Sequence, residues 1–165
     1  MTTTKTGFRP KRPGPDLRAV VLAGGRGTRF WPLGRAKKPK QFLPIAGRRS
    51  MAEETVRRIK PLIPARRVLF VADAGQTRSL RKLFPRFAAA NFLVEPLARN
   101  TAPSLMLATA RVWLENANAV IAVLPADHVV REPEKFLGKL EAAAGLAAAE
   151  PALVTFGIRP TYPAT

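Results

Sequence analysis

Three glycines near the start of the chain have a spacing that suits phosphate binding. Gly24, Gly25 and Gly27 follow the apolar run 17–23, and glycine lets main-chain N–H groups approach an anion with no Cβ in the way. Arg26 and Arg29 add positive charge, and one arginine can hold two phosphate oxygens. We interpret this stretch as a cradle for a nucleotide triphosphate. The alternative is a plain glycine turn between a strand and a loop.

A lysine cluster follows the glycines. It consists of Lys37, Lys38 and Lys40, with Pro39 between them and the apolar pair 42–43 after them. Lysine carries a compact charge that suits a phosphate whose negative charge grows during reaction. A solvated charged face is the alternative, but the proline and the apolar pair favour a shaped loop anchored to the core.

Two carboxylates follow later apolar runs. Asp127 comes after the run 119–124, and Mg²⁺ is commonly bound by one or two carboxylates together with substrate phosphates. Asp127 is therefore a candidate Mg²⁺ ligand, although aspartate at such a place also closes turns or caps helices. We interpret the neighbouring His128 as structural and not as a base. Glu95 could accept hydrogen bonds from the N1–H and amino groups of guanine, or it could be an ordinary loop residue.

Asn100 and Thr101 lie a few residues after Glu95. Their polar side chains either contact the base or cap the helix that is expected to follow. Capping is the simpler interpretation, and both residues remain candidates for nucleotide binding.

Alternating strands and helices must position these groups. The sequence predicts strands at 17–23, 66–72, 91–94, 119–124 and 152–157, and helices at 50–60, 75–84, 102–116 and 133–150. Ser50 and Glu53 have the spacing of a capping box at the start of the first helix. Such alternation predicts an α/β fold with a mostly parallel sheet and helices on both faces. Ligands bind at the carboxyl ends of strands in such sheets, so all these groups are expected at one edge.

Composition limits the class of protein. The chain has 165 residues, 47% of them hydrophobic, and no cysteine. This predicts one folded domain and excludes disulfides and thiolate metal sites. We find no apolar run of about 18 residues and expect no membrane span. Residues 1–16 are expected to form a flexible basic tail, and 17–165 the folded part.

Positive charge is concentrated around the glycines. The net charge is +17, and residues 1–49 hold 13 of the 28 Lys and Arg residues but only Asp16 of the 11 acidic residues. This distribution fits a phosphate-bearing small molecule or a nucleic acid. Nucleic-acid binding is the weaker interpretation because few aromatic residues accompany the basic loop and no helix-turn-helix or zinc pattern stands out.

Four ordered segments resemble one family. They are GGRGTRFWPLGRAKKPKQFLPIAG (24–47), EPLARNTAPS (95–104), LPADH (124–128) and TFGIRPTYPAT (155–165). Together they resemble the sugar-phosphate nucleotidyltransferases, and among these the mannose-1-phosphate guanylyltransferases. The resemblance implies a Rossmann-like nucleotidyltransferase domain. It also implies transfer of GMP from GTP to mannose 1-phosphate, giving GDP-mannose and pyrophosphate, in the cytoplasm. A homo-oligomer is compatible with the resemblance.

The resemblance also assigns roles by position. Arg29 and Lys40 would be catalytic and stabilise charge on the α-phosphate and the leaving pyrophosphate, and Asp127 would bind Mg²⁺. The nucleotide-binding residues would be Leu22, Ala23, Gly24, Gly25, Arg26, Gly27, Thr28, Glu95, Asn100 and Thr101.

Members of that family are about twice as long or more, so the resemblance implies a truncated domain. The later half of those proteins supplies much of the sugar-binding wall and a second metal-binding aspartate. We therefore expect this chain alone to bind GTP and Mg²⁺ weakly and to show little transferase activity. The alternatives are another sugar-1-phosphate nucleotidyltransferase and a folded, non-catalytic remnant.

Overall fold

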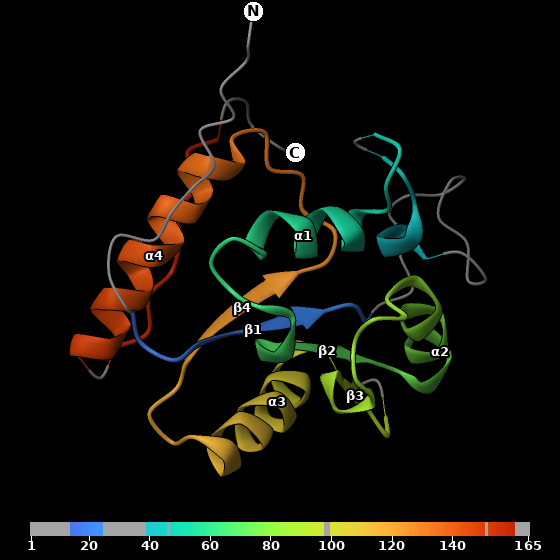
Figure 1. The fold of residues 1–165 in the computed structure, drawn as a ribbon, viewed down its shortest axis with the longest axis horizontal. Coiled ribbons are helices and arrows are strands. Elements are labelled where there is room, and N and C mark those ends of the chain that lie inside the picture. Colours follow the sequence, from blue (N-terminus) through green and yellow to red (C-terminus); the bar gives the residue numbers. More distant parts are fainter. Residues whose placement is uncertain (1–13, 25–38, 46, 98–99, 151, 161–165) are drawn as a thin grey trace, which may run out of the picture.

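The computed structural model describes residues 14–24, 39–45, 47–97, 100–150 and 152–160. Its centre is a sheet of four parallel strands in the order β3-β2-β1-β4 (Figure 1). The strands are β1 (Leu17–Leu22), β2 (Val68–Ala72), β3 (Phe92–Val94) and β4 (Val120–Pro125). The helices are α1 (Met51–Ile59), α2 (Ala74–Leu83), α3 (Thr101–Glu115) and α4 (Pro133–Ala149), with short 3-10 turns η2 (Lys40–Phe42), η3 (Ala65–Arg67) and η4 (Ala89–Asn91).

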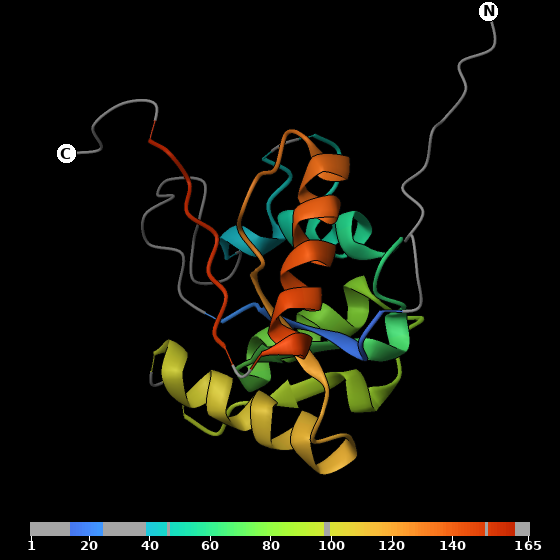
Figure 2. The ribbon, with the colours of Figure 1, turned by 90° about the vertical axis from the view of Figure 1, so that its left-hand side faces the viewer.

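Helices cover both faces of the sheet, as the alternation predicts. Alternate side chains of a strand point to opposite faces. In β1, Ala19 and Val21 pack in the main core with apolar residues of α1, α2 and α4. Val20 points the other way and packs with Ala108 of α3. Figures 1 and 2 show α3 alone on its side of the sheet, with α1 and α4 on the other.

Local side-chain bonds fix the starts of two helices. Ser50 and Glu53 form the predicted capping box, in which Ser50 Oγ accepts from the Glu53 N–H and the Glu53 carboxylate accepts from the Ser50 N–H. Asp73 caps α2 by accepting a hydrogen bond from the Gln76 N–H, at 2.8 Å. Each cap satisfies N–H groups that have no partner within the helix.

The eight elements predicted between residues 17 and 150 are present, with ends that differ by at most two residues. The predicted fifth strand at 152–157 is wrong, because residues 152–160 have neither strand nor helix. A strand is stabilised by pairing, and within the described residues β4 is an edge strand that pairs with β1 alone. Leu153 is fully exposed as a result.

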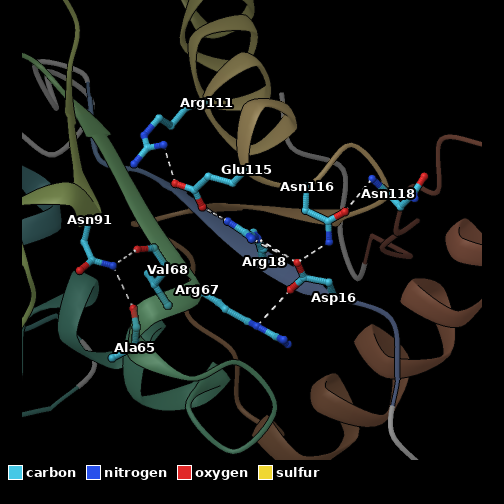
Figure 3. A network of polar contacts seen from close by, with 10 residues as sticks. All are labelled: Asp16, Arg18, Ala65, Arg67, Val68, Asn91, Arg111, Glu115, Asn116 and Asn118. Carbon is cyan, nitrogen blue, oxygen red and sulfur yellow. Dashed lines mark hydrogen bonds and ion pairs between the residues drawn. The ribbon is translucent and has the colours of Figure 1, made fainter.

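An ionic network closes the amino-terminal ends of the strands (Figure 3). Asp16 bonds to Arg18 at 3.2 Å, to Arg67 at 3.0 Å and to Asn116 at 2.8 Å, and Arg18 also pairs with Glu115. Burial alone would raise the pKa of Asp16, but the hydrogen bonds from Asn116 and Arg18 and the charges of Arg18 and Arg67 lower it overall. The network joins the starts of β1 and β2 to the end of α3.

Helix α3 has apolar residues on its outer side as well. Ser104, Ala108 and Val112 are buried, four residues apart, as expected for one helical face. Exposed apolar side chains on other sides of α3 include Met106, Leu107, Trp113 and Leu114. Among the described helices, none is both long and apolar enough to cross a membrane.

Candidate functional site

The carboxyl ends of the strands form one edge, as the parallel topology requires. The ladder continues just past β1, β3 and β4: Ala23 donates to the Val71 carbonyl at 3.0 Å, Glu95 to that of Ala72 at 2.9 Å, and Ala126 to that of Leu22 at 3.0 Å. The residues that follow these strands therefore share an edge. They are Gly24, Glu95 and Asp127.

Lys40 contacts Asp127 at this edge. The Lys40 ammonium forms an ion pair with the Asp127 carboxylate, and both side chains are about 21% exposed. Lys40 lies in η2 and Asp127 directly after β4. The pair therefore brings together the proposed phosphate-binding lysine and the proposed metal ligand, which lie far apart in the sequence.

Gln41 anchors η2 beside the glycines. Its side chain is 1% exposed, and its Nε2 donates to the carbonyl of Ala23 at 2.6 Å. Its Oε1 is buried and has no hydrogen-bond partner. The hydrogen bond from Nε2 holds the buried amide in place, because breaking it would leave the amide without any partner, at a cost of about 1–3 kcal/mol. Gln41 thus fixes the neighbouring Lys40 next to the end of β1.

Glu95 reaches past the end of β2 to Gly24. A Cβ placed on Gly24 would lie 3.4 Å from Oε2 of Glu95. The other oxygen, Oε1, accepts a hydrogen bond from the hydroxyl of Ser104, a buried residue of α3. One carboxylate oxygen is thereby fixed by α3, and the other faces the backbone where the glycine-rich stretch begins.

Asn100 and Thr101 stand at the start of α3 with exposed side chains. Asn100 occupies the N-cap position but makes no side-chain capping hydrogen bond, so the simple capping interpretation is wrong for its amide. Its backbone has φ 65° and ψ −171°, a region that non-glycine residues enter only at a cost of about 1–3 kcal/mol. Its carbonyl lies 3.0 Å from the Ser104 hydroxyl.

Arg58 holds the segment that follows Asp127. Its guanidinium donates to the His128 carbonyl at 3.3 Å and to the Thr55 hydroxyl at 3.1 Å, and it lies 5.3 Å from the centre of the Phe136 ring. Burial lowers the pKa of Arg58, although the charge of Glu54 acts in the opposite direction. His128 contributes its backbone carbonyl to this contact, and its side chain is exposed.

The remaining predicted site residues divide into two groups. Leu22 is half-buried at the end of β1 and Ala23 is buried beside it. Gly25, Arg26, Gly27, Thr28 and Arg29 lie outside the described residues, as do Lys37 and Lys38. The structure therefore describes one part of the candidate site, which consists of the strand ends, Lys40, Glu95 and Asp127.

The donor set at this edge fits a metal that arrives with a phosphate ligand. No group of three or more Asp, Glu, His or Cys side chains that could hold a metal occurs within the described ranges. Asp127 offers hard oxygen atoms next to Lys40. Mg²⁺ commonly takes one or two carboxylates and completes its shell with substrate phosphates and water, so a single aspartate fits a nucleotide-borne ion.

Gln41, Arg58 and Ser104 support the site, and no role was predicted for any of them. Gln41 lies next to Lys40 in the first family-like segment, and Ser104 is the last residue of the second. Arg58 lies in none of the four family-like segments. Its burial could not be predicted from the sequence, because a charged residue in an amphipathic helix is usually solvated.

Comparison with known proteins places the chain in one family. The nucleotidyl transferase family model matches residues 18–165. The xanthan biosynthesis protein XanB of Xanthomonas campestris is 39% identical over 154 residues, which are 91% of this chain and 32% of that protein. A mannose-1-phosphate guanylyltransferase of Salmonella muenchen is 40% identical over 155 residues, 88% of this chain and 31% of that protein.

A solved structure has the same fold. It is the Thermus thermophilus protein described as a mannose-1-phosphate geranyltransferase, with a TM-score of 0.70 and 38% identity. The match covers 82% of this chain and 38% of that one. This chain thus spans about a third of the length of these relatives. The family model matches nearly the whole chain, the relatives are up to 40% identical and the parallel sheet has the fold of a solved relative, so the chain belongs to the nucleotidyl transferase family.

Proposed function

We propose that this chain is the nucleotide-binding part of a mannose-1-phosphate guanylyltransferase. The reaction transfers GMP from GTP to mannose 1-phosphate and yields GDP-mannose and pyrophosphate. The observation that carries the proposal is the ion pair between Lys40 and Asp127, which lies at the carboxyl edge of the sheet, where the glycines follow β1. Relatives named mannose-1-phosphate guanylyltransferase, at up to 40% identity, support the choice of substrates.

The chemistry asks for positioning and neutralised charge. A phosphate oxygen of mannose 1-phosphate attacks the α-phosphorus of GTP, and the bond from that phosphorus to the β-phosphate's bridging oxygen breaks. The attacking oxygen is already anionic, so no protein nucleophile or base is needed. Lys40, together with Arg26 and Arg29, would hold the triphosphate and offset the charge that collects on the leaving pyrophosphate.

Asp127 would bind the Mg²⁺ that accompanies GTP, and the ion would supply further neutralisation of the phosphates when bound. In the structure the Lys40 ammonium neutralises the Asp127 carboxylate. With nucleotide and metal bound, Lys40 would pair with a phosphate and Asp127 would hold the metal.

Glu95 would read the base. Guanine presents N1–H and an amino group along one edge, and both are donors to a carboxylate. Adenine presents an acceptor at N1, which a carboxylate repels. The Oε2 atom of Glu95 faces Gly24, on the side of the edge where the nucleotide cradle begins. Asn100 and Thr101, with exposed side chains nearby in the chain, would add polar contacts.

A thermal melt of the chain with nucleotides tests the proposal. A ligand that binds only the folded state at ten times its Kd stabilises the protein by about 1.4 kcal/mol, which raises the Tm of a domain of this size by about 3–6 °C. We expect this rise with GTP and Mg²⁺ and a smaller one with ATP and Mg²⁺. Equal shifts for both nucleotides, or none, contradict the assignment of guanine.

The nucleic-acid alternative is tested by a separate binding experiment with DNA. Binding to DNA that weakens with salt and that excess GTP does not displace would favour it. Transferase activity of the chain alone is expected to be small, because the chain spans about a third of its relatives.

A further inference from the structure

The hydroxyl of Ser104 lies between two acceptors. Its Oγ contacts Oε1 of Glu95 and is 3.0 Å from the Asn100 carbonyl oxygen. A serine hydroxyl has a single proton to donate. A carboxylate is the stronger acceptor, because hydrogen bonds to an ionised group are shorter and stronger than neutral ones. The proton therefore goes to Glu95.

This bond is made in a protected place. Ser104 is 7% exposed and lies on the face of α3 that packs against the sheet. Glu95 is half-buried, and its main chain is fixed by the bond to Ala72. With the backbone and Oε1 both held, the position of Oε2 beside Gly24 follows. The freedom that a glutamate side chain normally has is removed before any ligand arrives.

We infer that Ser104 is a positioning residue that holds the Glu95 carboxylate in the orientation that selects guanine. The inference rests on the proposed function, in which Glu95 accepts hydrogen bonds from the base. Pre-ordering a side chain in its bound geometry increases affinity, because the loss of rotamer freedom does not then oppose binding. Ser104 itself touches no part of the nucleotide and acts through Glu95.

The strained backbone at Asn100 also supports the positioning of Glu95 by Ser104. Strained backbone persists where surrounding contacts over-determine it, and such residues gather at binding sites. Here the positive φ of Asn100 sets the direction in which α3 starts, and Ser104 stands one helical turn later. The direction of α3 in turn determines whether the Ser104 hydroxyl reaches Glu95.

The test compares the affinities of GTP–Mg²⁺ and ATP–Mg²⁺ for the whole chain, measured by NMR titration of backbone amides. In Ser104→Ala, the loss of a hydrogen bond to a charged group should reduce the affinity for GTP about fivefold or more. The affinity for ATP should stay within about twofold, because adenine makes no hydrogen bond to the carboxylate. Ser104→Thr keeps the hydroxyl and should keep the preference for GTP.

A double-mutant cycle with Glu95→Gln separates positioning from packing. Ser104→Ala should have no further effect on the GTP/ATP affinity ratio once Glu95 is replaced. Equal losses for both nucleotides in Ser104→Ala, or an unchanged ratio, overturn the inference and leave the proposed function standing. A wild-type chain without preference for GTP overturns the proposed function and the inference with it. Circular dichroism melts of each variant identify any that fails to fold, and Ser104→Thr then decides.

Discussion

The ammonium group of Lys40 forms an ion pair with the carboxylate of Asp127, and this contact joins η2 to the end of β4. The two residues belong to different segments of the sequence, and each was expected to act on the phosphates or their metal. Their contact means that the two ends of the predicted site do meet. It also means that the Lys40 ammonium neutralises the negative charge of the Asp127 carboxylate.

Replacement of Asp127 by Asn should remove the metal dependence of GTP binding. In the wild-type chain we expect GTP to bind about tenfold more tightly with Mg²⁺ than with a chelator, because the carboxylate and the phosphates share the ion. In Asp127→Asn the two affinities should agree. Glu134→Gln, an exposed carboxylate at the start of α4, is the matched control and should behave as wild type. A retained Mg²⁺ effect in Asp127→Asn would exclude it as the ligand.

Gln41 should be needed for stability as well as for binding. Gln41→Leu and the isosteric Gln41→Glu both remove the side-chain N–H that donates to the buried Ala23 carbonyl. We expect a loss of about 1–3 kcal/mol in the free energy of unfolding, with Gln41→Glu the worse because it buries a charge. Urea denaturation measures both. If both variants unfold like wild type, the anchoring role assigned to Gln41 is wrong.

Arg58 should matter more for local order than for overall stability. Arg58→Met removes the desolvation cost of a buried charge together with two hydrogen bonds. Because these effects oppose each other, we expect the free energy of unfolding to change by less than about 1 kcal/mol. Loss of the bond to the His128 carbonyl should still speed amide hydrogen exchange at residues 128–130.

The neighbouring exposed arginine provides the control for that experiment. Arg57→Met removes a charge from the same helix without a contact to His128 and should leave exchange at 128–130 unchanged. Equal exchange rates in Arg58→Met and Arg57→Met would show that Arg58 does not order the segment after Asp127.

The Asp16 network should make stability depend on acid pH. The pKa of Asp16 is lower in the folded chain than its ordinary value of 3.8, so ionised Asp16 favours the folded state. Its contribution is complete above the ordinary pKa and is lost as the pH falls through the folded-state pKa. Asp16→Asn should therefore cost about 2 kcal/mol at pH 7 and less at pH 3. Urea melts at both values test this, and a difference that does not shrink in acid contradicts it.

Local patterns predicted most of the fold. The apolar runs at 17–23 and 119–124 predicted strands, and the Ser50–Glu53 spacing predicted a helix start; the structure has both strands and the helix start. The run at 152–157 is also largely apolar, yet it forms no strand. Pairing depends on a neighbour along the sheet edge, and no property of the run itself contains that information.

Candidate site residues could be named from the sequence, but the contacts between them could not. Motif order and strand ends identified Lys40, Glu95 and Asp127. That Lys40 pairs with Asp127, and that Ser104 holds Glu95, depends on where η2 and α3 pack against the sheet. These are tertiary relations between distant segments, which neither residue type nor spacing determines.

The central claim is that nucleotide and metal bind at the carboxyl edge of the sheet. Paramagnetic broadening by Mn²⁺–GTP tests it most directly, because Mn²⁺ takes the oxygen ligands that Mg²⁺ takes and broadens only nearby amides. We predict loss of the amide signals of Ala23, Gly24, Ala126 and Asp127, with those of Arg18 and Arg67 at the opposite edge unaffected. Broadening centred on Arg18 and Arg67, or on no part of the described edge, would contradict the account.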